Sequence, residues 1–210
     1  MRVNRHAFLE HMEVMRVRPS DYVTCVSPRA LGAWVYGYGY VDESVATIWR
    51  STARHFSGPD CGDAATRSLL LYATDTLAFY ALVSALINET ISLNLLSKPS
   101  AYSGKSWIDA SKDHLLTRPG MVLGDSLVVN LTHQIHGYLN GLDAIYPERG
   151  IMERLDLKCF QDFLRNKHNE PLASWGSILR VFYAEDRDGV SAFVRLWDEF
   201  NRMTLVSDQG

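Results

Sequence analysis

The chain has 210 residues, of which 47% are hydrophobic and 21% charged, the composition of an ordinary globular protein. Its net charge of −3, without any run of Lys or Arg, argues against a nucleic-acid partner. Residues 1–17 mix charged and apolar side chains instead of forming the core of a signal peptide, and the longest apolar run, 77–87, is too short to cross a bilayer. The three cysteines have no metal-binding spacing and indicate reduced thiols in a cytoplasmic protein that does not enter a membrane.

The first two predicted helices are marked by the residues at their ends. Asn4 is placed to cap the first helix, and the Arg18-Pro19 step ends it, because the residue before a proline is pushed out of the helical region. Ser27-Pro28 starts the second helix, since Ser accepts hydrogen bonds from unpaired N–H groups and Pro is tolerated at the first helical position. The buried faces predicted for these helices are Phe8, Met12 and Met15, and then Leu31, Val35 and Tyr38.

Later helices are predicted from apolar spacing. In the first half, a third helix is followed by the turn-forming residues 57–63 and by a long helical stretch that is interrupted near Thr74-Asp75. In the second half, a helix near 106–116 precedes a second Arg-Pro step, and Asp125 or Ser126 caps the next helix. The residues expected to line the buried faces are Val45, Ile48, Trp49, Phe56, Leu69, Tyr72, Phe79, Leu82, Val83 and Leu86, and in the second half Leu155, Phe160, Phe163, Leu164, Trp175, Ile178, Leu179, Phe182, Phe193, Leu196, Trp197 and Phe200.

These patterns predict a mainly α fold. Two short apolar segments, 23–26 and 121–124, have the composition of strands. Because they are so brief, each is predicted to be an extended loop or part of a small pairing between the two halves of the chain.

The same residues recur in both halves at an offset of 100. Arg18-Pro19 aligns with Arg118-Pro119, and Gly37-Tyr38 aligns with Gly137-Tyr138, without a gap. Further along, YATD and AFYAL of the first half have counterparts in YAED and AFVRL of the second half, with the offset growing where loops can absorb insertions. Since self-similarity at a long period sets an architecture, we predict two tandem pseudo-repeats of about five helices each, packed as one compact unit.

A linker separates the predicted repeats. The segment SKPSAYSGKS, which ends at residue 106, is rich in Ser, Gly and Pro and has no periodic apolar pattern. The predicted organisation is therefore a first helical repeat over 1–97, a linker over 98–106 and a second helical repeat over 107–205.

Two histidines are the candidates for acid–base chemistry. His133 and His136 lie three residues apart on a predicted helix, so both could reach one metal ion. A catalytic zinc site needs a third protein ligand and a nearby carboxylate, which this segment lacks, so no metal or cofactor is expected. If the protein is an enzyme, His133 or His136 would act as the base, and Tyr138 or Tyr38 would position the substrate.

The repeated Arg-Pro and Gly-Tyr steps are the candidates for binding. Arg18 and Arg118 could each hold an anion, but an Arg where a helix ends more often bonds the unpaired carbonyls of that helix. The glycines of the two Gly-Tyr pairs are expected to let another helix approach closely. Around the first pair, aromatic residues alternate so that they cannot share one helical face, which predicts that some are exposed or line a groove that binds a partner. These residues are Trp34, Tyr36, Tyr38 and Tyr40.

The segment RPGMVLG (118–124) resembles two known motifs. One is the RPGMYIG segment of the ATPase subunit of type II topoisomerases, which a helix with a catalytic Glu follows; here the following helix, LTHQIHGYLNGLDA, has no Glu, which excludes that family. The other is the RPGMYLG opening of a group of small bacterial proteins of unassigned function. Members of that group continue with a helix ending in Gly-Tyr and close with an aromatic segment and a helix ending in L-x-E-F. Here residues 136–138 read HGY, and residues 185–200 resemble the closing helix but end in LWDEF. This resemblance implies a bacterial protein, and the first half resembles the group more loosely.

Two functions are consistent with these features. The first is a soluble bacterial binding protein of the immunity or regulatory type, which recognises a protein or a small ligand in a groove between the repeats. The alternative is a cofactor-independent enzyme that acts on a small apolar or aromatic metabolite by His/Tyr acid–base chemistry, for example in a biosynthetic pathway. A homodimer is compatible with both.

Overall fold

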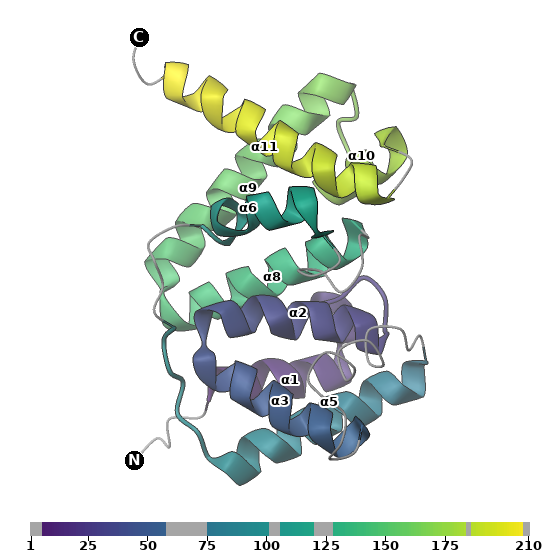
Figure 1. Cartoon of the computed structure of the whole chain (residues 1–210), viewed down its shortest axis with the longest axis vertical. Helices are drawn as coiled ribbons and strands as arrows, with labels where there is room; N and C mark the ends of the chain where they lie inside the picture. Colours follow the sequence, from purple (N-terminus) through teal and green to yellow (C-terminus); the bar gives the residue numbers. More distant parts are fainter. Residues whose placement is uncertain (1–5, 58–74, 101–105, 120–127, 184–185, 208–210) are drawn as a thin grey trace. The chain divides into compact units, whose positions relative to one another are not determined.

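The computed structural model describes residues 6–57, 75–100, 106–119, 128–183 and 186–207. In this part of the chain there are nine α-helices, one 3-10 turn (Pro19–Asp21) and no β-strand, which confirms the mainly α prediction. The helices, shown in Figure 1, are α1 (Ala7–Val17), α2 (Pro28–Val41), α3 (Glu43–Ser57), α5 (Thr76–Leu93), α6 (Trp107–Thr117), α8 (Val128–Ile145), α9 (Pro147–His168), α10 (Trp175–Phe182) and α11 (Asp186–Ser207).

Side chains cap several helices as their sequence suggests. The Ser27 hydroxyl accepts a hydrogen bond from the Ala30 N–H at 3.2 Å, and Pro28 is the first residue of α2, as predicted. Asp75 caps α5 by accepting from the Leu77 N–H at 2.8 Å. Helix α1 is capped by His6, whereas Asn4, the residue predicted to cap it, lies outside the described residues.

Other predictions about the elements have mixed outcomes. Residues 23–26 form no strand, and residues 58–63 and 121–127, with Leu69 and Tyr72, lie outside the described part of the chain. The prediction that Leu155 is buried is wrong: its side chain is 51% exposed, on the outer face of α9. Phe182, predicted to line the buried face of α10, is also exposed in large part.

The chain divides into two units, which differ from the two halves of the sequence. The first unit contains residues 1–104 and 133–150, and the second contains 105–132 and 151–210. Most of α8, a helix of the second half, therefore belongs with the helices of the first half.

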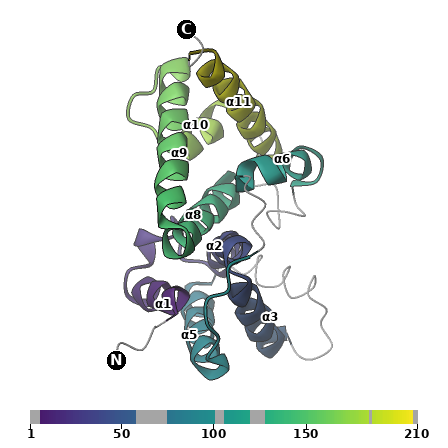
Figure 2. The ribbon, with the colours of Figure 1, turned by 90° about the vertical axis from the view of Figure 1, so that its left-hand side faces the viewer.

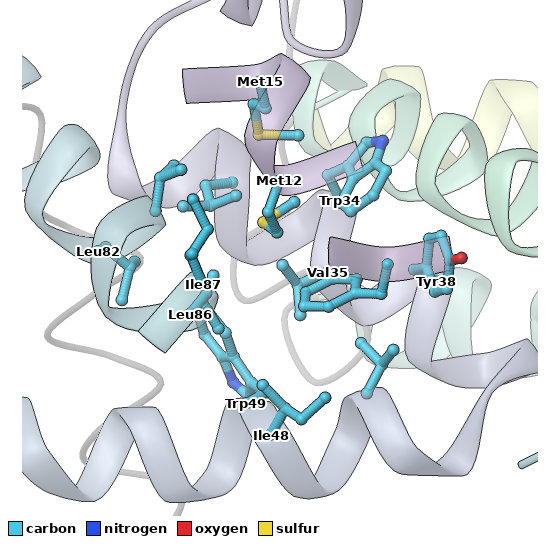
Figure 3. Packing of buried hydrophobic residues seen from close by; sticks show 14 of the residues in the cluster. Met12, Met15, Trp34, Val35, Tyr38, Ile48, Trp49, Leu82, Leu86 and Ile87 are labelled. Carbon is cyan, nitrogen blue, oxygen red and sulfur yellow. The ribbon is translucent and has the colours of Figure 1, made fainter. Parts of the chain in front are cut away.

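The first unit has an apolar core between α1, α2, α3 and α5. Figure 3 shows Met12 and Val35 inside this core, together with Trp49 from α3 and Leu82 from α5. Each large apolar side chain that is fully buried here stabilises the unit by about 2 kcal/mol relative to exposure.

Aromatic rings dominate the core of the second unit. The ring of Phe160 on α9 lies 5.5 Å from that of Phe193 and 5.0 Å from that of Trp197, both on α11. The α6 helix also packs against α11. Figure 2 shows α9 along its length, with α10 and α11 on one side of it.

One described helix, α5, has the length and hydropathy of a membrane-spanning segment, with a mean hydropathy of 1.4 over 18 residues. The core helix of a soluble protein passes the same test, and α5 packs against α1, α2 and α3. Of this 18-residue window, 33% is buried, and a single helix of this kind is weak evidence for a membrane span.

Candidate functional site

The Gly-Tyr pairs meet at a close crossing of α2 and α8. A Cβ atom added at Gly37 would lie 2.7 Å from the backbone nitrogen of Tyr138 and closer still to the carbonyl oxygen of Gln134. A Cβ atom added at Gly137 would lie 2.7 Å from the carbonyl carbon of Trp34. Real Cβ atoms do not approach backbone atoms this closely, so both positions require glycine. The predicted close approach of another helix is therefore present at both glycines.

The contacts at the crossing are reciprocal. Gly37 meets Gln134, and Gly137 meets Trp34. Each residue of one contact is 100 positions from its counterpart in the other contact. Such pairing is typical of an interface between two equivalent surfaces related by a two-fold axis.

The side chain of His133 is fully buried next to this crossing. Its Nε2 atom accepts a hydrogen bond from the backbone N–H of Thr24 at 3.1 Å and lies 2.9 Å from the Thr24 hydroxyl. Because Nε2 is an acceptor, the ring proton is on Nδ1, for which no hydrogen-bond partner is found among the described residues. Burial, and to a smaller extent His136, lowers the pKa of His133 to about 4. A histidine with this pKa is a weak base at neutral pH.

Two of the four alternating aromatic residues belong to the core. Trp34 and Tyr38 are fully buried, with ring centroids 5.2 Å apart, and His11 and Tyr22 contact the Trp34 ring edge-on. The indole nitrogen of Trp34 and the hydroxyl of Tyr38 lack a hydrogen-bond partner among the described residues. Burial raises the pKa of Tyr38, and nearby carboxylates, of which Asp42 contributes most, raise it further. Neither ring can meet a partner unless the core opens.

The other aromatic candidates are partly buried and contact neighbouring rings. Tyr36 packs edge-on against Trp49 at 6.2 Å, and Tyr40 packs against Tyr138 at 5.9 Å. His136 is half-buried on α8, whereas Tyr138 is buried. The structure thus brings Tyr40 and Tyr138 together, on the helices of the crossing.

The two arginines of the Arg-Pro steps have the same backbone role in their own units. Each is the C-cap residue directly after a helix, and its backbone N–H donates at 2.7 Å to the carbonyl four residues earlier, Val14 for Arg18 and His114 for Arg118. The side chain of Arg18 pairs with Asp21 at 3.5 Å and is exposed. Backbone groups of both residues therefore bond the preceding helix, and the predicted bonds from the arginine side chains to helix carbonyls stay a prediction.

A buried cluster of His6, Ser44 and Asp42, which we call the His6 cluster, was not found from the sequence. The Ser44 hydroxyl donates to Oδ1 of Asp42 at 2.6 Å and lies 2.7 Å from Nε2 of His6. Nδ1 of His6 accepts the Phe8 N–H at 3.3 Å, so the proton of the neutral ring is on Nε2 and is donated to Ser44. This order is the reverse of a catalytic triad, in which the histidine accepts the proton of the serine.

The outer face of α9 also differs from its prediction. Ile151, Met152 and Leu155 are 66%, 58% and 51% exposed, and Cys159, one turn further, is an exposed thiol. Spacings of three and four residues place them along one face, and Phe160 is on the opposite, buried face. Large apolar side chains gathered on one exposed face are typical of a binding surface. The signal was present in the sequence as a second apolar line on this helix.

No group of three His, Cys, Asp or Glu side chains that could hold a metal ion is found in the described part of the chain. A comparison of the sequence and structure with known protein families, curated proteins and solved structures finds no match.

Proposed function

We propose that this chain is a soluble bacterial binding protein, of the immunity or regulatory type, that docks a partner protein on the outer face of α9. The observation that carries the proposal is the exposed apolar line of Ile151, Met152 and Leu155 on three-residue and four-residue spacing. This spacing matches the way a helix presents side chains to an amphipathic segment of another protein.

The charges beside this line favour a different protein over a second copy. Arg154 and Lys158, four residues apart, border it on one flank and are exposed. In an antiparallel pair of α9 helices, the same flank of each helix would face the other, which would bring the exposed Lys158 of each copy to the same side of the pair. A partner with carboxylates beside its apolar residues fits this flank better.

The enzyme alternative has less support. His133 has a pKa of about 4, and its acceptor nitrogen is occupied by Thr24. Among the described residues, the buried Ser, His and Asp of the His6 cluster have the wrong hydrogen-bond order for nucleophilic catalysis.

We also infer that the scaffold arose by tandem duplication. The reciprocal contacts of Gly37 and Gly137 support this inference, as do the equal lengths of α1 and α6, which have 11 residues each and begin 100 residues apart.

Site-specific photo-crosslinking tests the binding proposal. A benzophenone amino acid replaces Leu155 in one variant and Val181 in another, because Val181 is a similarly exposed apolar residue on α10. In cells of the source organism, position 155 is expected to give a discrete adduct with one other protein, and position 181 is not. The adduct should disappear when Ile151→Asp is added, since a carboxylate on the apolar line disfavours its burial. Equal adducts at both positions, or an adduct with a second copy of the chain alone, would contradict the proposal.

A further inference from the structure

The His6 cluster connects three separate segments of the first unit. His6 precedes α1, Ser44 is in the first turn of α3, and Asp42 is the C-cap residue directly after α2. The Oδ1 atom of Asp42 also accepts the backbone N–H of Lys98 at 3.0 Å, in the segment between the halves of the chain. Oδ1 of Asp42 therefore bonds both α3 and the segment around Lys98. Ser44, which donates to this oxygen, also bonds His6, the residue that caps α1.

We propose that the His6 cluster is an acid-sensitive clasp. At neutral pH it holds the start of α1 and the segment around Lys98 against the α2–α3 corner, the short connection at Asp42 between these two helices, and in acid it releases them. The proposal rests on where a second proton must go. The nitrogen Nε2 already carries a proton, which it donates to Ser44, so protonation takes place on Nδ1. A protonated Nδ1 cannot accept the Phe8 N–H, and α1 then loses its cap.

Protonation also changes the charge beside Asp42. Its Oδ2 atom lies 3.8 Å from Nε2 of His6 and has no hydrogen-bond partner among the described residues. A cationic ring is drawn toward this oxygen and away from Ser44, which weakens the link that runs through Ser44 and Oδ1 to Lys98. The first proton thus disturbs all three segments.

Among the described residues, Asp42 is the charged group that acts on the pKa of His6. Glu43 and Lys98 at the same corner pair with each other at 2.7 Å. The α5 helix, which packs against α1, carries one charged residue, Glu89, and it accepts a hydrogen bond from Ser51 at 2.6 Å. Burial lowers the pKa of His6, and Asp42 raises it by a smaller amount. The folded state therefore holds His6 neutral, and the clasp weakens as the pH falls below about 6.5, where an unfolded histidine takes up its proton.

Amide hydrogen exchange measured by NMR on the full chain tests this proposal. The amides of Phe8, Ser44 and Lys98 all donate to the His6 cluster. Their protection, corrected for the intrinsic rate, is expected to fall by about tenfold or more between about pH 7.5 and pH 5. The Ala30 amide, which the hydroxyl of Ser27 caps in the same way, provides the internal control and should keep its protection.

Two variants distinguish release of the clasp from a general loss of stability in acid. In His6→Asn, an amide oxygen takes the place of Nδ1 and does not titrate, so the cap should remain and the three amides should lose their pH dependence. In Ser44→Ala, the Phe8 amide should keep its pH dependence while the Lys98 amide loses it, because the connection between them is removed. The proposal fails if His6→Asn keeps the wild-type response, or if the wild-type Phe8 amide responds to acid while the Lys98 amide does not.

Discussion

His133 is a buried histidine whose structural role is visible in its hydrogen bonds. Its Nε2 atom holds the backbone of Thr24, which lies in the loop between α1 and α2. A proton on Nε2 would remove this acceptor and place a charge in the core. The neutral form is therefore the one compatible with the fold, as its pKa of about 4 indicates.

This pKa makes stability depend on pH. Because an unfolded histidine titrates near 6.5, the unfolded state binds the proton first, and the free energy of unfolding falls as the pH decreases from 6.5 to about 4. The contribution of His133 lost over this range is about 3 kcal/mol. Urea unfolding at several pH values measures this contribution as the difference in the pH dependence of the free energy of unfolding between wild type and His133→Gln. The side-chain oxygen of the Gln variant can still accept the hydrogen bond from Thr24. Identical pH dependence in the two proteins would show that His133 does not titrate in this way.

At the scale of the elements, the α2–α8 crossing depends on two glycines. An added methyl group at Gly37 or Gly137 meets backbone atoms, which cannot rotate away, so the helices must separate. At Gly39, also on α2, an added methyl group would make ordinary contacts with Ala46, the nearest at 3.5 Å.

Three alanine variants test this difference. Gly37→Ala and Gly137→Ala are each expected to lower the free energy of unfolding by about 3 kcal/mol, because both overpack the crossing. The double variant should cost less than the sum, since either substitution alone already separates the same helices. Gly39→Ala should be neutral or stabilising by up to about 1 kcal/mol, because alanine favours a helix more than glycine does. Additive losses in the double variant would mean that the glycines act at separate places.

Local signals predicted the elements better than they predicted the candidate site. Ser27-Pro28 marked the start of α2 because capping depends on neighbouring residues alone. On α9, spacing placed Leu155 on an apolar line, but the helix has two such lines, and only tertiary packing decides that Phe160 faces inward. The His6 cluster could not be predicted, because its histidine lies 38 residues from its serine and no local spacing connects them.

At the scale of the whole molecule, the halves of the sequence and the units of the fold do not coincide. The first unit takes residues 133–150 from the second half, and the reciprocal contacts of Gly37 and Gly137 lie inside it. If the chain arose by duplication, one helix of the second copy was kept as a structural part of the first. The linker is likewise more than a spacer, since Lys98 and Ser100 bond the α2–α3 corner.

The place of α8 in the first unit has a consequence for synthesis on the ribosome. Helices α1 to α5 leave the ribosome before the helix that completes their unit, because residues 105–132 are translated in between. At a translation rate of about 5–20 residues per second, the face of α2 that carries Gly37 stays uncovered by α8 for several seconds. During that interval it is open to a factor that protects nascent chains, or to α8 from a neighbouring polypeptide on the same messenger.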